Sequence, residues 1–207
     1  MRKTGVIVAV VLAAVALVLF VRYGASDAPI SGDCRGLPLE GTVEDIRPDD
    51  LGVAYVSGGN TIWLVDLNVR EPRPRAALAS EPTNFRPTGI SLFGNRLFAV
   101  DRHEDGASQI MIFEKTVTGA YALAEKPMRD ELLTAPEAVR AVGPQQFYVA
   151  NEAASFIHDP TALYYDGSKL LAVTDGSAAA PTRNLTVTRG NLTLLAGEDR
   201  KLTLCRK

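Results

Sequence analysis

Few side chains in this sequence can carry acid–base chemistry, because its 207 residues include two histidines, His103 and His158. A general base must titrate near the working pH and reach the proton that it removes. His103 lies in the charged segment Asp-Arg-His-Glu-Asp, a setting that fits either a catalytic base or a surface loop. His158 has no recognisable partner, which favours a loop role.

Two other hydrolytic chemistries are not supported by the residue spacing. No Gly-x-Ser-x-Gly string occurs, so the nucleophile elbow of the α/β hydrolases is missing. Two histidines without His-x-x-x-His spacing provide too few ligands for a zinc enzyme. Two cysteines exclude a Cys-rich metal site.

The chain begins with an apolar leader, in which residues 5–21 form 17 consecutive positions without a charged or polar side chain. A membrane helix needs about 17–25 such residues, whereas the apolar part of a cleaved signal peptide usually has about 7–15. We therefore expect residues 1–26 to form an uncleaved transmembrane helix that anchors the chain in the membrane. Arg2 and Lys3 favour a cytoplasmic N-terminus. The alternative is a cleaved signal and a secreted product, and in both cases the rest of the chain is extracytoplasmic.

The composition of the exported part limits its partners. Three of the 22 basic residues (Arg2, Lys3 and Arg22) lie in the leader, which leaves 19 basic against 24 acidic residues and a formal charge of −5. A mildly acidic domain without a basic run does not favour nucleic-acid binding. We expect a linker at residues 27–38 and one domain at 39–207.

If the chain is exported, its two cysteines can form a disulfide. Cys34 follows the leader and Cys205 lies close to the chain end. In an oxidising compartment the two thiols can form a disulfide that closes a long loop and stabilises the fold by about 4–5 kcal/mol. The alternative is two unpaired thiols. A bridge between the chain ends is most useful if those ends form adjacent strands of one structure.

Short apolar runs dominate the domain and predict an all-β fold. Each has four to six residues that are rich in branched or aromatic side chains, and turn residues separate them. The runs are 52–57, 61–66, 96–101, 109–113, 146–150, 162–165, 169–173, 184–188, 191–195 and 201–205.

A strand–turn–strand pattern recurs with propeller spacing. Residues 85–100 and 138–150 share this layout about 50 residues apart, and residues 45–56 form a looser copy. A period of 40–50 residues with four strands per unit is typical of β-propellers. We predict a small propeller of about four blades, with residues 39–46 completing the last blade. A half-propeller completed by a second chain is the alternative.

Several stretches resemble the arylesterase/paraoxonase family in collinear order. They are Gly-Thr-Val-Glu-Asp-Ile-Arg-Pro (41–48), Gly-Val-Ala-Tyr-Val-Ser-Gly-Gly (52–59), Phe-Arg-Pro-Thr-Gly-Ile-Ser-Leu (85–92), Leu-Phe-Ala-Val-Asp-Arg-His (97–103), Ala-Val-Gly-Pro-Gln-Gln-Phe-Tyr-Val-Ala-Asn (141–151) and Ala-Leu-Tyr-Tyr-Asp-Gly-Ser-Lys-Leu-Leu-Ala-Val (162–173). The resemblance implies an exported propeller that hydrolyses esters or lactones with calcium. It also implies an uncleaved apolar N-terminus and a disulfide between the chain ends.

The resemblance further implies a set of metal ligands. Glu44 corresponds to a ligand of the catalytic calcium and Asp45 to a ligand of the structural calcium. Glu137 and Ala138 stand where the family has an Asn-Asp pair, so Glu137 is a third candidate ligand. Adjacent strand residues point to opposite faces, which suits two separate sites. The alternative is that these carboxylates are solvated turn residues.

The chain also departs from the family in length and at its catalytic residues. Two middle blades are expected to be absent. Thr88 replaces the histidine of the family's Pro-His-Gly-Ile motif, and His103 matches the partner histidine only if one residue is inserted, since ungapped alignment puts Arg102 there. Two functions follow: a paraoxonase-like, calcium-dependent ester or lactone hydrolase with weak or absent activity, or a membrane-anchored propeller that has become a binding module.

Overall fold

The computed structural model describes residues 32–103, 107–152, 162–173, 181–197 and 199–206. Residues Asp33–Arg206 form one compact unit. Its described part contains four antiparallel sheets of four strands each, which we call blades 1 to 4. The predicted all-β fold of about four blade-like sheets is thereby confirmed.

The first three blades each use four consecutive strands. Blade 1 contains β2 (Val43–Pro48), β3 (Val53–Gly58), β4 (Thr61–Asp66) and β5 (Pro74–Ala76). Blade 2 contains β6 (Pro87–Phe93), β7 (Arg96–Arg102), β8 (Ser108–Lys115) and β9 (Tyr121–Leu123). Blade 3 contains β10 (Pro136–Ala141), β11 (Phe147–Asn151), β12 (Ala162–Tyr165) and β13 (Leu170–Ala172).

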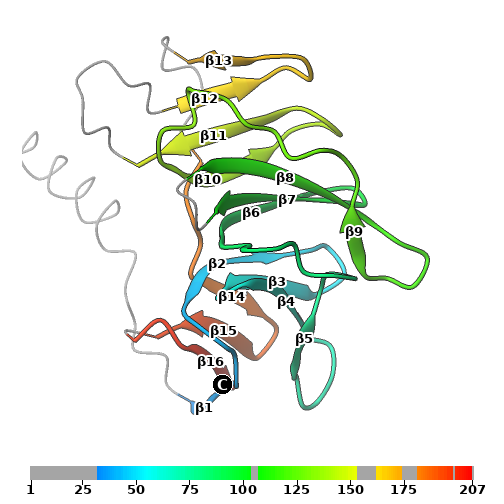
Figure 1. Cartoon of the computed structure of the whole chain (residues 1–207). Helices are drawn as coiled ribbons and strands as arrows, with labels where there is room; N and C mark the ends of the chain where they lie inside the picture. Colours follow the sequence, from blue (N-terminus) through cyan, green and yellow to red (C-terminus); the bar gives the residue numbers. More distant parts are fainter. Residues whose placement is uncertain (1–31, 104–106, 153–161, 174–180, 198, 207) are drawn as a thin grey trace, which may run out of the picture. The chain divides into compact units, whose positions relative to one another are not determined.

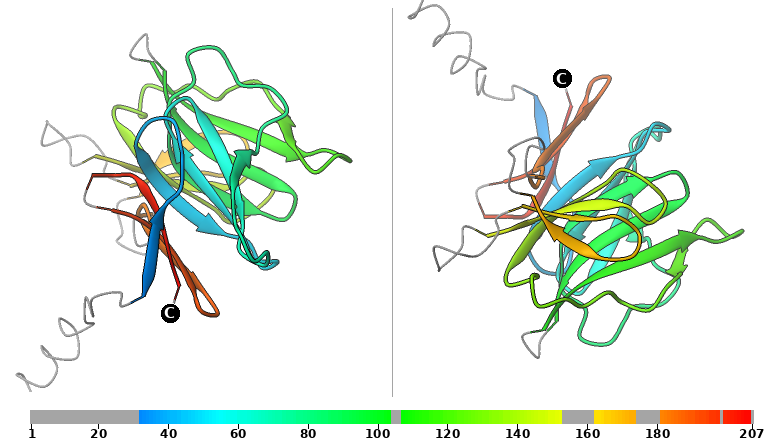
Figure 2. Two further views of the ribbon diagram at one scale, coloured as in Figure 1. Left: turned by 90° about the horizontal axis from the view of Figure 1, so that it is seen from below. Right: turned by 90° about the horizontal axis from the view of Figure 1, so that it is seen from above.

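Blade 4 joins the two ends of the domain. Its strands are β14 (Thr186–Arg189), β15 (Leu192–Ala196), β16 (Leu202–Arg206) and, at the outer edge, β1 (Asp33–Gly36). Both views in Figure 2 show the blue first strand beside the red last strand. The completing strand is therefore Asp33–Gly36, within the predicted linker, and the expectation that residues 39–46 complete the blade is wrong.

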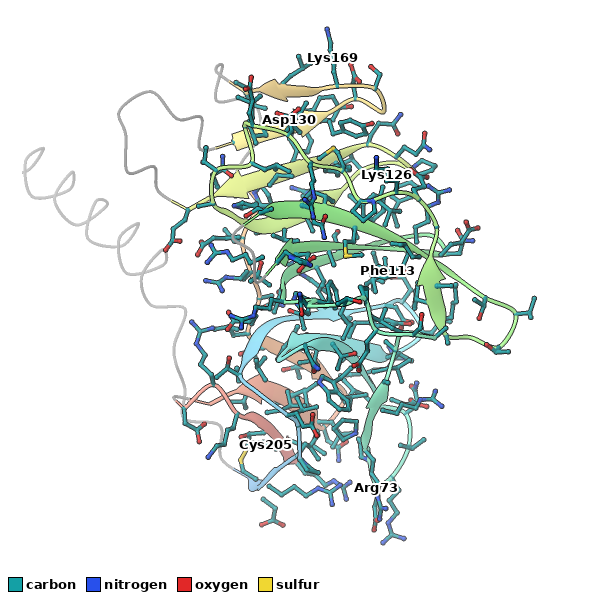
Figure 3. The ribbon with its side chains drawn as sticks, viewed as in Figure 1. Arg73, Phe113, Lys126, Asp130, Lys169 and Cys205 are labelled. Carbon is teal, nitrogen blue, oxygen red and sulfur yellow. A yellow bond between two sulfur atoms is a disulfide. The ribbon has the colours of Figure 1, made fainter. Side chains whose placement is uncertain are left out.

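The predicted disulfide fastens this closure. Cys34 lies opposite Cys205 in the pairing of β1 with β16, and the two cysteines form a disulfide. Figure 3 labels Cys205 beside its yellow sulfur in blade 4. Because neither strand needs a long apolar stretch once the bond has formed, a short and exposed β1 can still hold its place at the edge.

Glycines with positive φ occupy several of the tight turns that join neighbouring strands. Gly94 (φ 58°) and Gly190 (φ 59°) occupy the turns between β6 and β7 and between β14 and β15. Positive φ is costly for residues that carry a Cβ atom. The recurring hairpins expected from the sequence correspond to β2–β3, β6–β7 and β10–β11.

The core lies between successive blades. Three apolar clusters of the described residues fill the spaces between blades 4 and 1, 1 and 2, and 2 and 3. Phe113, labelled in Figure 3, belongs to the second cluster, and Phe98 contacts Phe147 in the third with ring centroids 5.7 Å apart. Figure 1 shows the resulting order, from blade 3 at the top through blades 2 and 1 to blade 4 at the bottom.

The first strands of neighbouring blades contact one another in the order β14, β2, β6 and β10. None of the three clusters of described residues joins blade 3 to blade 4. Because β6 contacts both β2 and β10, polar side chains at the beginnings of these three strands lie close together. These are the positions of the candidate site.

The predicted membrane anchor, residues 1–26, lies outside the described residues. In the described part of the chain, no helix has the length and apolar character needed to cross a membrane.

Candidate functional site

A cavity of about 820 Å³ opens where blades 1 and 2 meet. Three of its wall residues occupy the candidate positions singled out by the family resemblance: Glu44, Thr88 and Arg102. The remaining wall consists of the segment before β2, the β3–β4 turn and the loop that leads into β6: Glu40, Gly41, Thr42, Gly59, Asn60, Pro82, Asn84, Phe85, Arg86 and Pro87.

Irregular strand pairing places equivalent residues at this end of three blades. The register shifts between Val43 and Asp45 in β2, between Pro87 and Ile90 in β6, and between Pro136 and Ala138 in β10. Glu44, Thr88 and Glu137 lie in these three bulges. A β-bulge adds one residue to a strand and redirects its side chain, and such bulges are frequent beside active sites.

Arg183 joins the two glutamates. Its Nη1 donates to Glu44 Oε2 at 2.7 Å, and its Nη2 donates to Glu137 Oε1 at 3.2 Å. All three side chains are half-buried. The two carboxylates predicted to share a cation are thus brought to one cation, the guanidinium of Arg183.

Arg102 extends this ion-pair network toward blade 3. Its Nη2 lies 3.7 Å from Glu137 Oε1 and 3.2 Å from Glu152 Oε2, and its Nε donates to the Pro136 carbonyl at 3.1 Å. Arg102 also lines the cavity, so the network reaches the cavity wall.

Asp45 lies apart from this network, as expected for a residue adjacent to Glu44. Its fully buried carboxylate accepts backbone N–H groups of Ile46 (3.0 Å), Ile90 (2.9 Å) and Asn184 (2.6 Å) and the Nε of Arg47 (3.1 Å). Burial raises the pKa of this carboxyl above its ordinary value, while Arg47 and the N–H donors lower it. Asp45 therefore connects blades 1 and 2 with the segment that leads into blade 4.

Thr88 occupies the cavity wall at the position of the family histidine. It is 9% exposed, and its Oγ1 has no hydrogen-bond partner among the described residues. Its backbone carbonyl accepts the hydroxyl of Ser57 in blade 1. The side-chain oxygen is thus buried within the cavity wall.

His103 follows directly after β7 and is half-buried. The described lining of the cavity includes Arg102 but not His103. His158 lies outside the described residues.

The described donor set does not fit calcium while Arg183 is in place. Calcium takes six to eight oxygen ligands, whereas Glu44 and Glu137 face a guanidinium and both Asp45 oxygens accept N–H donors. Within the described residues, no group of three or more His, Cys, Asp or Glu side chains is arranged to hold a metal ion.

The arylesterase family model matches residues 48–165, more than half of the chain. The chain belongs to the arylesterase family. The matched range contains Thr88, Arg102 and Glu137, so most of the candidate site falls within the arylesterase region.

Individual arylesterase relatives are distant. Serum paraoxonase/arylesterase 2 of Gallus gallus is 29% identical over 130 residues, covering 52% of this chain and 36% of the relative. Serum paraoxonase/lactonase 3 of Oryctolagus cuniculus is 26% identical over 177 residues, covering 69% and 49%. The chain thus spans less than half the length of these curated relatives. A solved structure of YCF48 bound to D1 peptide aligns with a TM-score of 0.48 at 17% identity, over 84% of this chain and 55% of that one.

Sequence reasoning did not identify Arg183 as part of this candidate site. Arg183 lies 139 residues from Glu44, in a stretch without any family motif. The available signal was indirect: two glutamates at one position require a positive charge between them.

Proposed function

We propose that the chain binds carboxylic esters or lactones in the cavity lined by Glu44, Thr88 and Arg102, and hydrolyses them slowly if at all. The observation that carries this proposal is that a cavity of about 820 Å³ lies at the family motif positions of a chain that belongs to the arylesterase family. That volume is in the range of small-molecule sites.

One group in the wall suits the recognition of an ester. The guanidinium of Arg102 can donate to a carbonyl oxygen. A donor aimed at that oxygen also stabilises the negative charge that develops on it during attack by water. Arg102 thus supports binding and polarisation of an acyl group.

The described wall of the cavity offers no strong general base to activate water. Threonine has no titratable proton acceptor near neutral pH, and Glu44 is engaged in an ion pair with Arg183. His103 remains the candidate catalytic base, on the strand end beside Arg102. Losing general-base assistance typically lowers a rate by about 10²–10⁴.

Calcium enters the proposal only through the family. Glu44 and Glu137 are the residues that would hold a catalytic calcium and Asp45 a structural one, but their present contacts belong to Arg183 and to backbone N–H groups. We therefore assign no step of the reaction to a metal.

Hydrolysis of phenyl acetate and a panel of lactones tests the function. We expect slow turnover by the wild type, a gain of at least tenfold in Thr88→His, and a loss of substrate-induced thermal stabilisation in Arg102→Met. Thr88→Val is the matched control, because it preserves the side-chain shape without adding a base. Fast turnover by the wild type that Thr88→Val leaves unchanged would exclude this cavity as the site.

The binding-module function remains the second candidate, favoured by Thr88 and by the Arg183 bridge. It predicts that esters or lactones stabilise the protein without being hydrolysed, in the wild type and in Thr88→His alike. Product formation by the wild type would decide against it, whereas turnover by Thr88→His alone would mean that the site geometry is retained and only the chemistry was lost.

We also propose an extracytoplasmic location with residues 1–26 anchored in the membrane. The Cys34–Cys205 disulfide supports an oxidising compartment. Cell fractionation tests the anchor: a product that begins near residue 27 and is released from membranes would mean that the leader is a cleaved signal and the protein is secreted.

A further inference from the structure

The contacts of Arg183 connect segments that are far apart in the sequence. Glu44 belongs to blade 1, Glu137 to blade 3, and Arg183 to the segment that precedes blade 4. No apolar cluster of described residues packs blade 3 against blade 4. The guanidinium of Arg183, which precedes blade 4, therefore contacts both blade 1 and blade 3.

Backbone contacts hold Arg183 in this position. The Asn184 N–H donates to Asp45, the Asn184 carbonyl accepts the N–H of Ile46 at 2.6 Å, and the Thr182 carbonyl accepts the guanidinium of Arg47. Residues on both sides of Arg183 are thus bound to β2. With the backbone already fixed in this way, pairing with the two glutamates has to order only the side chain.

The two glutamates need a positive charge between them. Like carboxylates held together repel each other unless a cation compensates their charge or one of them takes up a proton. A guanidinium is permanently charged and donates to two acceptors with its two terminal nitrogens. Arg183 meets this need without any component from solution.

We propose that the guanidinium of Arg183 takes the place of a bound divalent cation between Glu44 and Glu137, so that the folded chain is independent of calcium. Replacing Arg183 by a neutral residue then leaves two facing carboxylates that a divalent cation can bridge. This inference does not rest on the proposed hydrolase function, because it concerns the stability of the fold.

The test compares thermal unfolding of the full-length chain with EDTA and with about 10 mM calcium chloride, a concentration above the Kd of roughly 10⁻⁴–10⁻³ M of weak calcium sites. The wild type should have the same Tm in both conditions. Arg183→Met should lose about 4 °C or more in EDTA, and calcium should restore at least half of that loss. If Arg183→Met is unfolded in EDTA, refolding on addition of calcium is the same readout.

Two controls make the result specific. Arg183→Met combined with Glu44→Gln and Glu137→Gln should recover stability in EDTA and show no response to calcium. Arg129→Met removes an arginine that donates to the amide oxygen of Gln109 at 2.9 Å and has no carboxylate partner among the described residues, so calcium should not restore its stability. A Tm of the wild type that rises with calcium by as much as that of Arg183→Met would overturn the proposal. Failure of calcium to stabilise Arg183→Met, or equal rescue of Arg129→Met, would do the same.

Discussion

The carboxylate of Asp45 in blade 1 accepts the backbone N–H of Ile90 in blade 2 at 2.9 Å. Ile90 is the first residue to regain regular pairing after the bulge that contains Thr88. Asp45 thereby fixes the position of the cavity wall in the next blade, while its neighbour Glu44 lines the same cavity.

Replacing Asp45 by alanine should destabilise the protein strongly. The change leaves the N–H groups of Ile90 and Asn184 without their acceptor and Arg47 without its carboxylate partner. We expect a loss of about 3 kcal/mol or more in the free energy of unfolding, measured by urea denaturation. Asp199→Ala is the control, because Asp199 is an exposed turn residue, and it should lose far less stability. Equal effects of the two changes would contradict this role.

The contribution of Asp45 should also depend on pH. Burial raises the pKa of its carboxyl above 3.8. A carboxyl with a higher pKa in the folded chain binds more protons when folded, so its favourable contribution is present below the unfolded pKa and declines as pH rises through the folded pKa. The difference in free energy of unfolding between wild type and Asp45→Ala should therefore narrow from about pH 3.8 toward neutrality. A difference that widens over this range would contradict the prediction.

Gly89→Ala should push blades 2 and 3 apart. A Cβ atom at position 89 would lie 2.5 Å from Ala138 Cα and 2.5 Å from the Glu137 carbonyl oxygen, both backbone atoms that cannot rotate away. We expect a loss of about 1–3 kcal/mol in the free energy of unfolding, as for other overpacked cores. Gly36→Ala is the matched control, because no atom lies within 4 Å of its added Cβ. If both variants unfold at the wild-type urea concentration, blades 2 and 3 do not depend on this close approach.

Removing the disulfide with Cys34→Ser and Cys205→Ser should destabilise the chain by about 5 kcal/mol in the chain-entropy model. The bond closes a loop with a sequence separation of 171 residues, and β1 is otherwise a short exposed edge strand. Urea denaturation of the double variant beside the oxidised and reduced wild type measures the effect. The reduced wild type should match the double variant, and a loss below about 1 kcal/mol would show that β1 holds without the bond.

Much of the strand order followed from local sequence patterns. The hairpins expected at residues 45–56, 85–100 and 138–150 match β2–β3, β6–β7 and β10–β11. Alternating branched residues with intervening glycine turns act over a few residues, so they can be recognised without tertiary contacts. The disulfide was predictable for a different reason. The sequence has only two cysteines, and an exported chain meets oxidising conditions in which they can pair.

The closing strand β1 and the three bulges were harder to predict from the sequence. Asp33–Gly36 is polar and exposed, so no apolar pattern distinguishes it from a linker, and its partner β16 lies at the far end of the chain. The bulges at Glu44, Thr88 and Glu137 arise from the register of two strands together. A single strand's sequence does not contain that register.

The sequence by itself predicted an all-β chain of about four blades and a pair of terminal cysteines, and its family resemblance implied Glu44, Asp45 and Glu137 as candidate ligands. Only the tertiary structure decided what these carboxylates contact: Arg183 for the two glutamates, and backbone N–H groups and Arg47 for Asp45. Strand formation depends on neighbours along the chain, whereas an ion pair across 139 residues depends on how separate blades pack. For that reason the need for a cation was visible in the sequence, and its identity was not.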